Sequence, residues 1–433
     1  MLNLLINKKI IKNLLNIVNA LLLNLFRNKF YLFTQHQNYF TSLKYSKNLI
    51  GKEDETVIEN FEKKFSLLVG SGSSVSYGAG RMGFYSLLKI LKISKGDEII
   101  LTSGNCSVMI NAILKLEATP IFSDISDYTL GSDVNEIKKK ITSKTRVIVA
   151  QHNFGIPCKI DEIKEFCQLN KIFLLEDCAL SLCSKFKGIK VGNFGDAALF
   201  SFDNSKPLPL FSGGIIYTKN NDLYHKLKQQ QENIGVLNKK KQKVIFKKLL
   251  LDYKFNHPRH YRFLYMVNIL TSLKIKFGLT SPYLDENYVA FPINESYEYP
   301  CKIPTFLAYL GIELIDKWGD IVKNRLANLR YLINLLTNSK YSNCIPKIYS
   351  DSNYNIIPLR LVLIDSSSLD LEELLSAIID VKSSWFKNPI VSTKEELFSF
   401  KYKNKSCPKS EQIGSQIINL PIEYKLKELK DIL

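Results

Sequence analysis

Hydrophobic and polar residues follow two different periods along the body of the chain, which predicts helices interleaved with short buried strands. Short apolar runs bounded by polar or glycine-containing turns predict strands at residues 74–77, 98–101, 120–122, 146–150, 172–175, 197–202 and 214–217. Apolar residues at helical spacing predict helices at residues 61–68, 81–91, 111–116, 133–141 and 160–170. Strands that alternate with helices indicate an α/β fold with a mostly parallel sheet. Such sheets bind ligands at the carboxyl ends of their strands.

The last third of the chain has a different pattern, which predicts a smaller α+β domain. We expect a long helix from about residue 312, a strand at 356–363, a helix at 371–379 and a helical segment after Pro421. We therefore predict a large domain over residues 53–300 and a small C-terminal domain over residues 301–433. An N-terminal extension occupies residues 1–52, and a Lys-rich, largely helical insertion interrupts the large domain at residues 219–278.

The extension begins with a predicted helix at residues 1–26, whose leucines and isoleucines recur at helical spacing. Its longest unbroken apolar run, Ala20–Leu23, is much shorter than the ~20 residues that a membrane span needs. Three interpretations stay open. The helix lies on an anionic membrane surface, it packs on the domain or a partner, or it is a transit peptide.

Charge is concentrated in two segments of an otherwise neutral chain. The 433 residues include 59 Lys and Arg and 41 Asp and Glu, for a net charge of +18, and 45% are hydrophobic, which excludes a disordered or collagen-like chain. Residues 1–52 carry +8 and residues 219–278 carry +11, so the rest sums to −1. We therefore expect no nucleic-acid partner. We expect a cytoplasmic protein, and our hypothesis is that the two basic segments contact the inner face of a membrane.

Cysteine and histidine usage indicates neither disulfides nor a metal site. Eight cysteines are scattered along the chain without a Cys-x-x-Cys pair, and only five histidines are present. This usage favours a reducing compartment and predicts no bound metal.

Three polar features accompany the predicted strands and helices. The turn Gly78-Ala79-Gly80-Arg81 opens a predicted helix, whose first N–H groups can bind a phosphate. Asp177 follows one buried strand, and Lys206 lies just past another, where an amine can act as a nucleophile. Each alone is compatible with an ordinary turn, helix cap or surface residue. Together they supply the amine, the carboxylate and the phosphate-binding turn that a pyridoxal phosphate site needs.

Longer phrases around these residues carry a family resemblance. They are GAGRMGFYSLLKILKISKGDEIIL, ATPIFSDISDYTLGSDVNEIKKKITSKTRVIVAQHNFGIP, EDCA, GIKVGNFGDAALFSF, SKPLPLFSGG and the C-terminal CPKSEQIGSQIINLPI. The chain resembles the DegT/DnrJ/StrS family of pyridoxal-phosphate-dependent sugar aminotransferases over most of residues 55–430. The resemblance implies the fold-type I architecture. It also implies a homodimer in which the second subunit completes each active site.

The resemblance also implies roles for individual residues. Lys206 would form the Schiff base with pyridoxal 5'-phosphate and act as the general acid and base, and Asp177 would pair with the pyridine nitrogen. Ser201 would bind the cofactor phosphate together with the backbone of Gly80 and Arg81. Cys106 occupies the position of the usual ring-stacking residue. His152 and Lys302 occupy positions near the substrate, although a structural role for His152 is an open alternative.

The implied reaction moves an amino group, usually from glutamate, to a nucleotide-linked keto-sugar for cell-surface polysaccharide or glycan synthesis. A related dehydratase would have His in place of Lys206, so that residue argues against it. A catalytically lapsed relative with a scaffold or regulatory role is the alternative. Leu180, where the family usually has Gln or His, and Pro300, in place of a conventional Asn, are the departures that favour it.

Overall fold

The computed structural model describes most of the chain from residue 40 onward. The described residues are 40–255, 270, 273, 298–366, 371–376, 379, 381, 386–391, 393, 396–423, 425–431 and 433. The predicted helix at residues 1–26 and much of the segment from 256 to 278 lie outside them. Among the described helices, none combines the length and the apolar character that crossing a membrane requires.

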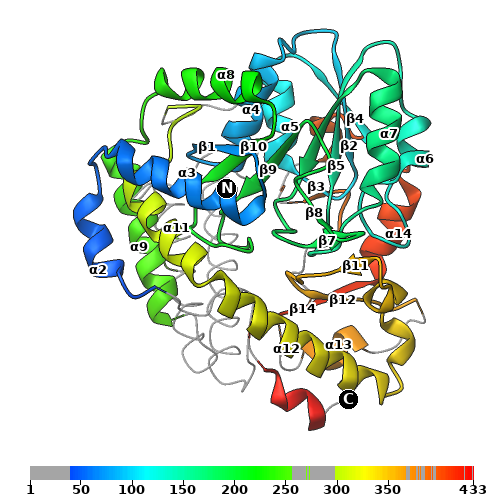
Figure 1. Cartoon of the computed structure of the whole chain (residues 1–433). Coiled ribbons are helices and arrows are strands. Elements are labelled where there is room, and N and C mark those ends of the chain that lie inside the picture. The colour runs from blue at the N-terminus through cyan, green and yellow to red at the C-terminus, as the bar shows by residue number, and fades with distance from the viewer. Residues whose placement is uncertain are drawn as a thin grey trace, which may run out of the picture.

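A seven-stranded sheet forms the centre of the molecule, with the strand order β1-β10-β9-β6-β5-β2-β4 (Figure 1). Its strands are β1 (Ser73–Tyr77), β2 (Glu98–Thr102), β4 (Thr119–Ser123), β5 (Thr145–Gln151), β6 (Phe173–Asp177), β9 (Ala197–Ser201) and β10 (Gly214–Thr218). All neighbours from β9 to β4 are parallel, whereas β10 is antiparallel to both β9 and β1. The predicted mostly parallel sheet is therefore confirmed.

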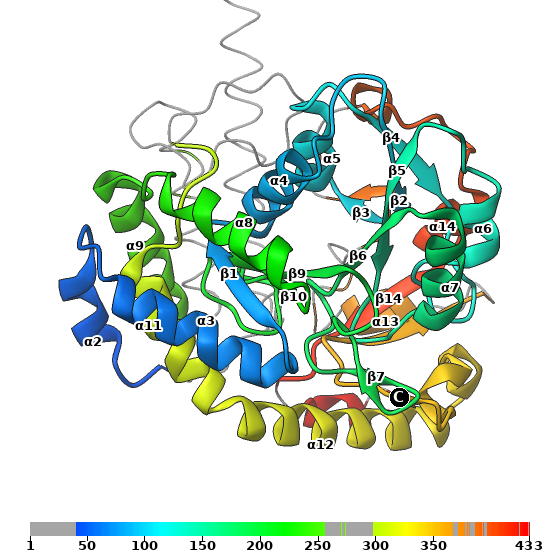
Figure 2. The same cartoon turned by 45° about the horizontal axis from the view of Figure 1, so that its top comes forward.

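Helices cover both faces of the sheet, which explains why its strands read as continuous apolar runs. Successive residues of β5 point to opposite faces: Val147 and Val149 join one core, while Ile148 and Ala150 join the other. The first core includes residues of α3 (Glu55–Val69), α4 (Gly80–Ile90) and α5 (Ser107–Leu114), and the second includes residues of α6 (Val134–Lys138) and α7 (Ile160–Asn170). The two layers are visible in Figure 2.

The helix that the sequence predicted from residue 312 is two helices in the structure. These are α11 (Thr305–Asp316), which begins after Pro304, and α12 (Trp318–Thr337). Helix α11 packs against α3 in the first core, and α12 runs from that core to a third one formed by C-terminal residues. The domain boundary between residues 300 and 301 stays a prediction.

The C-terminal part of the chain contains a second, smaller sheet. Strand β12 (Leu361–Ile364) pairs antiparallel with β14 (Ile417–Leu420), and helix α13 (Leu371–Ser376) packs its Leu371 and Leu375 into the same core. The strand predicted at 356–363 is thus shorter and begins later. The predicted helical segment after Pro421 is a 3-10 helix at Lys427–Asp431.

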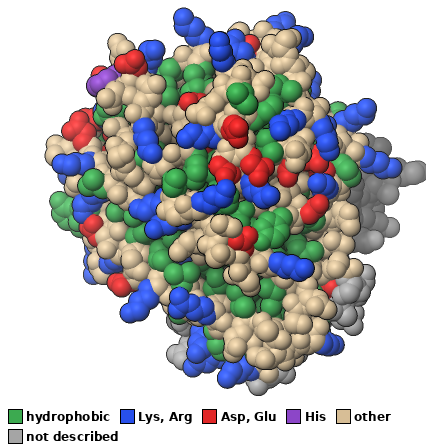
Figure 3. Space-filling model, turned by 45° about the vertical axis from the view of Figure 1, so that its right-hand side comes forward, with side chains coloured by type: hydrophobic (Ala, Val, Ile, Leu, Met, Phe, Trp, Pro, Cys, Tyr) green, Lys and Arg blue, Asp and Glu red, His purple; other side chains and the backbone are tan. Residues whose placement is uncertain are grey.

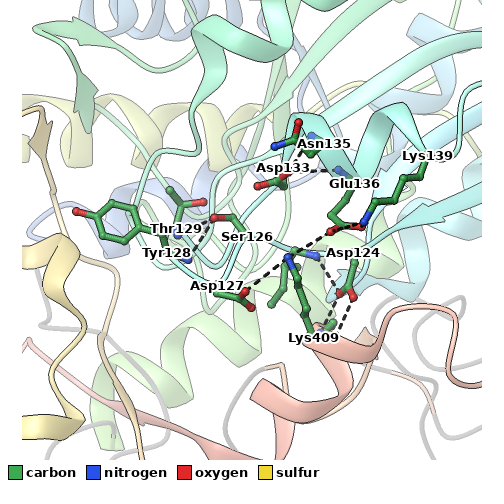
Figure 4. Close-up of polar contacts among 12 residues, drawn as sticks. Asp124, Ser126, Asp127, Tyr128, Thr129, Asp133, Asn135, Glu136, Lys139 and Lys409 are labelled. Atoms are coloured by element: carbon green, nitrogen blue, oxygen red, sulfur yellow. Dashed lines mark hydrogen bonds and ion pairs between the residues drawn. The ribbon is translucent and has the colours of Figure 1, made fainter.

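Contacts with segments that follow β2 and β4 hold this C-terminal region against the large sheet. Strand β13 (Ile390–Val391) pairs in parallel with β3 (Asn105–Cys106). The carboxylate of Asp124, just after β4, accepts the backbone N–H groups of Lys409 and Ser410 at 2.8 and 2.9 Å, at the first turn of α14 (Pro408–Gln416) (Figure 4). A carboxylate at this position satisfies N–H groups that the helix itself leaves without partners.

The described part of the Lys-rich segment consists of α8 (Asn221–Glu232) and α9 (Lys239–Phe255). Helix α9 buries Ile245, Phe246 and Leu249 in the first core, and Phe246 contacts Phe306 of α11 edge to face. Its Gln242 accepts the backbone N–H of Gly51 at 2.8 Å. Helix α9 is therefore part of the packed body, with its apolar stripe turned inward.

Candidate active site

A cavity of about 430 Å³ opens at the carboxyl ends of the central parallel strands. Gln151, Asp177 and Ser201, the last residues of β5, β6 and β9, all line it. This is the edge at which parallel α/β sheets bind ligands. The volume falls in the range of about 300–1,000 Å³ that small-molecule sites usually have.

Lys206 lines this cavity from the turn that follows β9. Its backbone N–H donates to the Asp203 carbonyl at 3.1 Å, and only 7% of the residue is exposed. Burial lowers the pKa of the Lys206 amine, and the neighbouring Cys106, Asp203 and Asp177 act against that lowering. The amine is therefore uncharged more often at neutral pH than a surface lysine is, which a nucleophilic amine requires.

Asp177 is the last residue of β6, and its carboxylate is also buried at the cavity. Its Oδ1 accepts the backbone N–H of Ala179 at 3.0 Å. Burial raises the pKa of Asp177, and the Ala179 N–H, Lys206 and His152 partly oppose that rise. A cationic ligand group beside this carboxylate would favour its ionised form.

The turn before α4 forms a cup at one end of the cavity. Gly80 is the first residue of α4, and no side chain caps the N-terminus of this helix. A Cβ atom built on Gly80 would lie 3.2 Å from the Ser201 Cβ, so glycine permits the close approach of α4 to β9. Arg81 follows and lines the cavity as well. The Ser205 hydroxyl is buried at the cavity and has no hydrogen-bond partner among the described residues.

These groups fit pyridoxal phosphate. The amine of Lys206 and the carboxylate of Asp177 lie in one cavity. The cup beside them offers the N–H groups of a helix start and serine hydroxyls, and both can donate hydrogen bonds to a phosphate. Cys106, the N-cap residue of α5, is partly exposed on the same wall. The structure therefore brings six of the predicted site residues together: Gly80, Arg81, Cys106, Asp177, Ser201 and Lys206. The role of each stays a prediction.

His152 does not line the cavity, so the structure gives no support to a direct contact with substrate. Its ring is fully buried, and Nε2 lies 3.2 Å from a Glu176 carboxylate oxygen. Nδ1 accepts the backbone N–H of Cys158 at 3.0 Å. Glu176 in turn accepts the N–H groups of Gly192, Phe194 and Gly195. Both ring nitrogens are engaged beneath the site, which matches the alternative of a structural histidine.

Lys302 also lies away from the cavity. Its Nζ is 2.8 Å from a carboxylate oxygen of Glu55 at the start of α3, and its backbone N–H donates to the Gly235 carbonyl. Within this chain the ammonium group of Lys302 is held by α3, and its contact with substrate stays a prediction.

Leu180 lines the cavity where the family usually has a hydrogen-bonding side chain. It also packs with Leu130, Phe154 and Val362, in a cluster that joins the large domain to the C-terminal region. The neighbouring Ser181 cannot replace the missing donor, because its hydroxyl donates to the His152 carbonyl at 3.0 Å. This departure from the family pattern thus has a packing role.

Part of the cavity wall comes from residues that the sequence did not predict to line the site. Phe386, Asn388 and Ile390 reach it from the C-terminal region, and Lys248 reaches it from α9. The pairing of β13 with β3 and the 2.6 Å hydrogen bond from the Gly104 N–H to the Pro389 carbonyl hold the C-terminal residues in place. The one available signal was the inward-facing stripe of α9, since Ile245, Lys248, Leu249 and Asp252 recur at helical spacing.

Comparisons with known proteins agree with this geometry. Residues 36–258 match the model of the DegT/DnrJ/EryC1/StrS aminotransferase family. GDP-perosamine synthase of Escherichia coli O157:H7 is 35% identical over 195 residues, which are 42% of this chain and 54% of that protein. The spore coat polysaccharide biosynthesis protein SpsC of Bacillus subtilis is 32% identical over 209 residues, 45% of this chain and 53% of that protein. The chain thus spans about half the length of the curated relatives it matches.

A solved structure shows the same fold over nearly the whole chain. NtdA from Bacillus subtilis with bound cofactor PMP has a TM-score of 0.64 and 18% sequence identity, covering 90% of this chain and 81% of that one. The similarity extends through the C-terminal region, beyond the residues that the family model matches, and confirms the expected α/β architecture.

Proposed function

Because this chain belongs to the DegT/DnrJ/EryC1/StrS aminotransferase family, we propose that it is a pyridoxal-phosphate-dependent aminotransferase. Its amino acceptor is a nucleotide-linked keto-sugar, and its amino donor is an amino acid such as glutamate. The observation that carries the proposal is the joint position of Lys206 and Asp177 on one cavity, beside the Gly80–Ser201 cup. The names of the relatives, which include a GDP-perosamine synthase, support a sugar nucleotide as the acceptor.

The residues divide the work by their chemistry. Pyridoxal phosphate supplies an electron sink for the carbon that gains or loses the amino group. Lys206 provides the amine that holds the cofactor and, once displaced, accepts and returns the proton at the reacting carbon. Asp177 favours a protonated pyridine nitrogen by facing it with a negative charge. Ser201, Ser205 and the backbone of Gly80 and Arg81 bind the phosphate and fix the position of the ring.

The absorbance spectrum of the purified protein tests the proposal. The wild type, reconstituted with pyridoxal phosphate, should absorb in the visible, and glutamate should shift that absorbance. Lys206→Ala should lose the visible band, whereas Lys95→Ala, which removes an exposed lysine away from the cavity, should keep it. Borohydride reduction followed by peptide mapping should place the cofactor mass on Lys206. A wild type that stays colourless would contradict the enzyme proposal and favour the alternative of a catalytically lapsed scaffold or regulator.

We also propose that the chain forms a homodimer in which the second subunit completes each site, as the family resemblance implies. Light scattering coupled to size-exclusion chromatography tests the assembly. A second inactive variant would carry a substitution in a residue that one subunit contributes to the site of the other. If the sites are shared, mixing this variant with Lys206→Ala should restore activity. A monomer that is fully active would contradict this proposal.

Peripheral contact with an anionic membrane is proposed on charge alone. Residues 1–52 carry +8 without any acid, and each basic residue near such a surface contributes about 1 kcal/mol. On the face drawn in Figure 3, the basic side chains of the described residues are scattered and mixed with acidic ones, which supports neither a continuous membrane patch nor a nucleic-acid site there. Sedimentation with anionic vesicles at low salt tests the contact, and deletion of residues 1–39 should abolish it.

A further inference from the structure

One cation at the cavity comes from an unexpected part of the chain. Lys248 belongs to α9, in the Lys-rich segment, and it lines the same cavity as Lys206 and Asp203. Its neighbour Lys247 is exposed, so the two lysines differ in direction although they are adjacent in sequence. Helix geometry explains the difference, since consecutive residues point about 100° apart around the axis.

The packing of α9 fixes the position of Lys248. Ile245 and Leu249, which flank it on the helix, are buried in the first core, and they hold this face of α9 against the body of the molecule. Gln242, about two turns earlier, binds the backbone of Gly51. Lys248 is therefore presented to the cavity by a docked helix rather than by a surface loop.

Basic side chains outnumber acidic ones on the cavity wall. The described lining residues include Arg81, Lys206, Lys248 and Lys387, against Asp177 and Asp203. Lys387 is already paired, with its Nζ 2.5 Å from a Glu372 oxygen. Burial lowers the pKa of Lys206, the proposed nucleophile, and disfavours its charged form, so Arg81 and Lys248 are the cations that can face an anion. Burial lowers the pKa of Lys248, although Asp203 acts in the opposite direction. An ammonium group that is partly removed from water gains when an anion binds beside it.

We propose that Lys248 binds a phosphate group in the active-site cavity, and that the Lys-rich segment thereby contributes a phosphate-binding residue to the site. The proposal rests on the proposed function for the identity of its ligands. Two phosphate sources fit this chemistry, the 5'-phosphate of the cofactor and the diphosphate of the sugar nucleotide. A lysine ammonium suits either one, because it acts as a point charge toward phosphate oxygens.

Two binding measurements on the purified full chain separate these sources. The first titrates cofactor-free protein with pyridoxal phosphate and, in parallel, with pyridoxal, which lacks the phosphate. The second follows the binding of inorganic pyrophosphate to the cofactor-loaded protein by calorimetry. Each uses Lys248→Ala, with Lys247→Ala as the matched control, because that variant removes the same charge from the same helix at an exposed position. Lys248→Gln replaces the alanine variant if the latter does not fold.

Lys248→Ala should lower the affinity for either pyridoxal phosphate or pyrophosphate by about tenfold or more, and Lys247→Ala should change neither affinity. A lower affinity for pyridoxal phosphate with an unchanged affinity for pyridoxal identifies the cofactor phosphate as the ligand. A lower affinity for pyrophosphate alone identifies the substrate diphosphate. Equal losses for pyridoxal and pyridoxal phosphate, or identical behaviour of the two lysine variants, would overturn the proposal. A wild type that binds pyrophosphate but never acquires visible absorbance would contradict the proposed enzyme activity. The comparison of pyrophosphate binding between Lys248→Ala and Lys247→Ala would still test the role of Lys248.

Discussion

Asp177 and Lys206 line one cavity although they belong to different strands, because β6 and β9 are parallel neighbours in the sheet. Asp177 pairs with Leu199, and the turn that carries Lys206 begins shortly after that residue. The two side chains influence each other, since Lys206 opposes the raised pKa of Asp177 and Asp177 opposes the lowered pKa of Lys206. Burial acts more strongly on both groups than this attraction does.

The burial of Asp177 predicts that replacing it has opposite effects on stability and on activity. A carboxyl group whose pKa is raised in the folded protein binds more protons there than in the unfolded chain. The contribution of Asp177 to the stability of the cofactor-free protein therefore falls as the pH rises above 3.8, the ordinary value, until the pH passes the raised folded value. Asp177→Asn removes this titration, so its stability relative to wild type should increase with pH over the same window. Denaturant unfolding at several pH values measures the difference.

The same variant should lose activity, because an amide cannot face the pyridine nitrogen with a negative charge. We expect the rate of amino transfer to fall by about 100-fold or more. A constant stability difference between Asp177→Asn and wild type from acid to neutral pH would contradict the assignment of a raised pKa.

Gly104 should tolerate no side chain, and a second glycine provides a control. Both Gly104 and Gly96 have positive φ, +84° and +95°, so alanine at either position costs about 1 kcal/mol or more in backbone strain. A Cβ on Gly104 would also lie 2.5 Å from the Phe386 ring, while one on Gly96 would meet nothing within 4 Å. Gly104→Ala should therefore lower the melting temperature more than Gly96→Ala.

Phe386 lines the cavity, so displacing its ring should also weaken cofactor binding in Gly104→Ala. Titration with pyridoxal phosphate, followed in the visible, measures this effect. Equal melting temperatures and equal cofactor affinities in the two glycine variants would show that Phe386 can move aside without consequence.

Asp124 should contribute more to stability than its exposed neighbour Asp127. Asp124→Ala removes the acceptor for two N–H groups at the start of α14, which should cost about 1–2 kcal/mol in the free energy of unfolding. Asp127 pairs with the Lys409 ammonium, at 3.5 Å and with much of its side chain exposed (Figure 4). Asp127→Ala should cost no more than about 1 kcal/mol. Denaturant unfolding of both variants tests the ranking, and the reverse order would contradict the capping role.

Leu180 should behave as a packing residue despite its place on the cavity wall. Leu180→Gln puts an amide into the cluster formed with Leu130, Phe154 and Val362, and should lower the free energy of unfolding by about 1–3 kcal/mol. Leu169→Gln, on an exposed position of α7, should change it by less than about 0.5 kcal/mol. If Leu180→Gln is as stable as wild type and binds the cofactor more tightly, the leucine serves no packing purpose.

The parts of the site that the sequence predicted are those encoded next to a strand. Asp177, Ser201 and Lys206 end or follow apolar runs, and a parallel sheet brings such positions to one edge. His152 also follows a strand, but its ring turns beneath the edge toward Glu176, and an alternating pattern does not show how deeply a polar side chain at a strand end is buried. A local signal of this kind therefore places a residue near the site without stating what it contacts.

The residues that the sequence analysis missed depend on packing between distant segments. The high net charge of the Lys-rich segment predicted a surface location, yet α9 buries Ile245 and Leu249 and so places Lys248 at the cavity. Phe386 reaches the wall because β13 pairs with β3, and the residues next to Phe386 in the sequence do not predict this pairing. The region predicted as one long helix forms α11 and α12 because the two helices pack in different places. Phe306 of α11 belongs to one core and Leu332 of α12 to another.

The long-range closure of the cavity has a consequence for the order of events during synthesis. The Ser103 hydroxyl, beside the wall residue Gly104, contacts the Ser410 hydroxyl across 307 positions of the chain. Contacts of this separation form late, because a long loop must close first, and nascent chains order their N-terminal parts earliest. When residue 300 has just been synthesised, Asp177 and Lys206 have already left the ribosome, but the C-terminal residues of the cavity wall have not yet been made. We therefore expect a cofactor to bind only after the C-terminal wall residues have been made, and a prematurely terminated chain to leave Asp177 and Lys206 open to water.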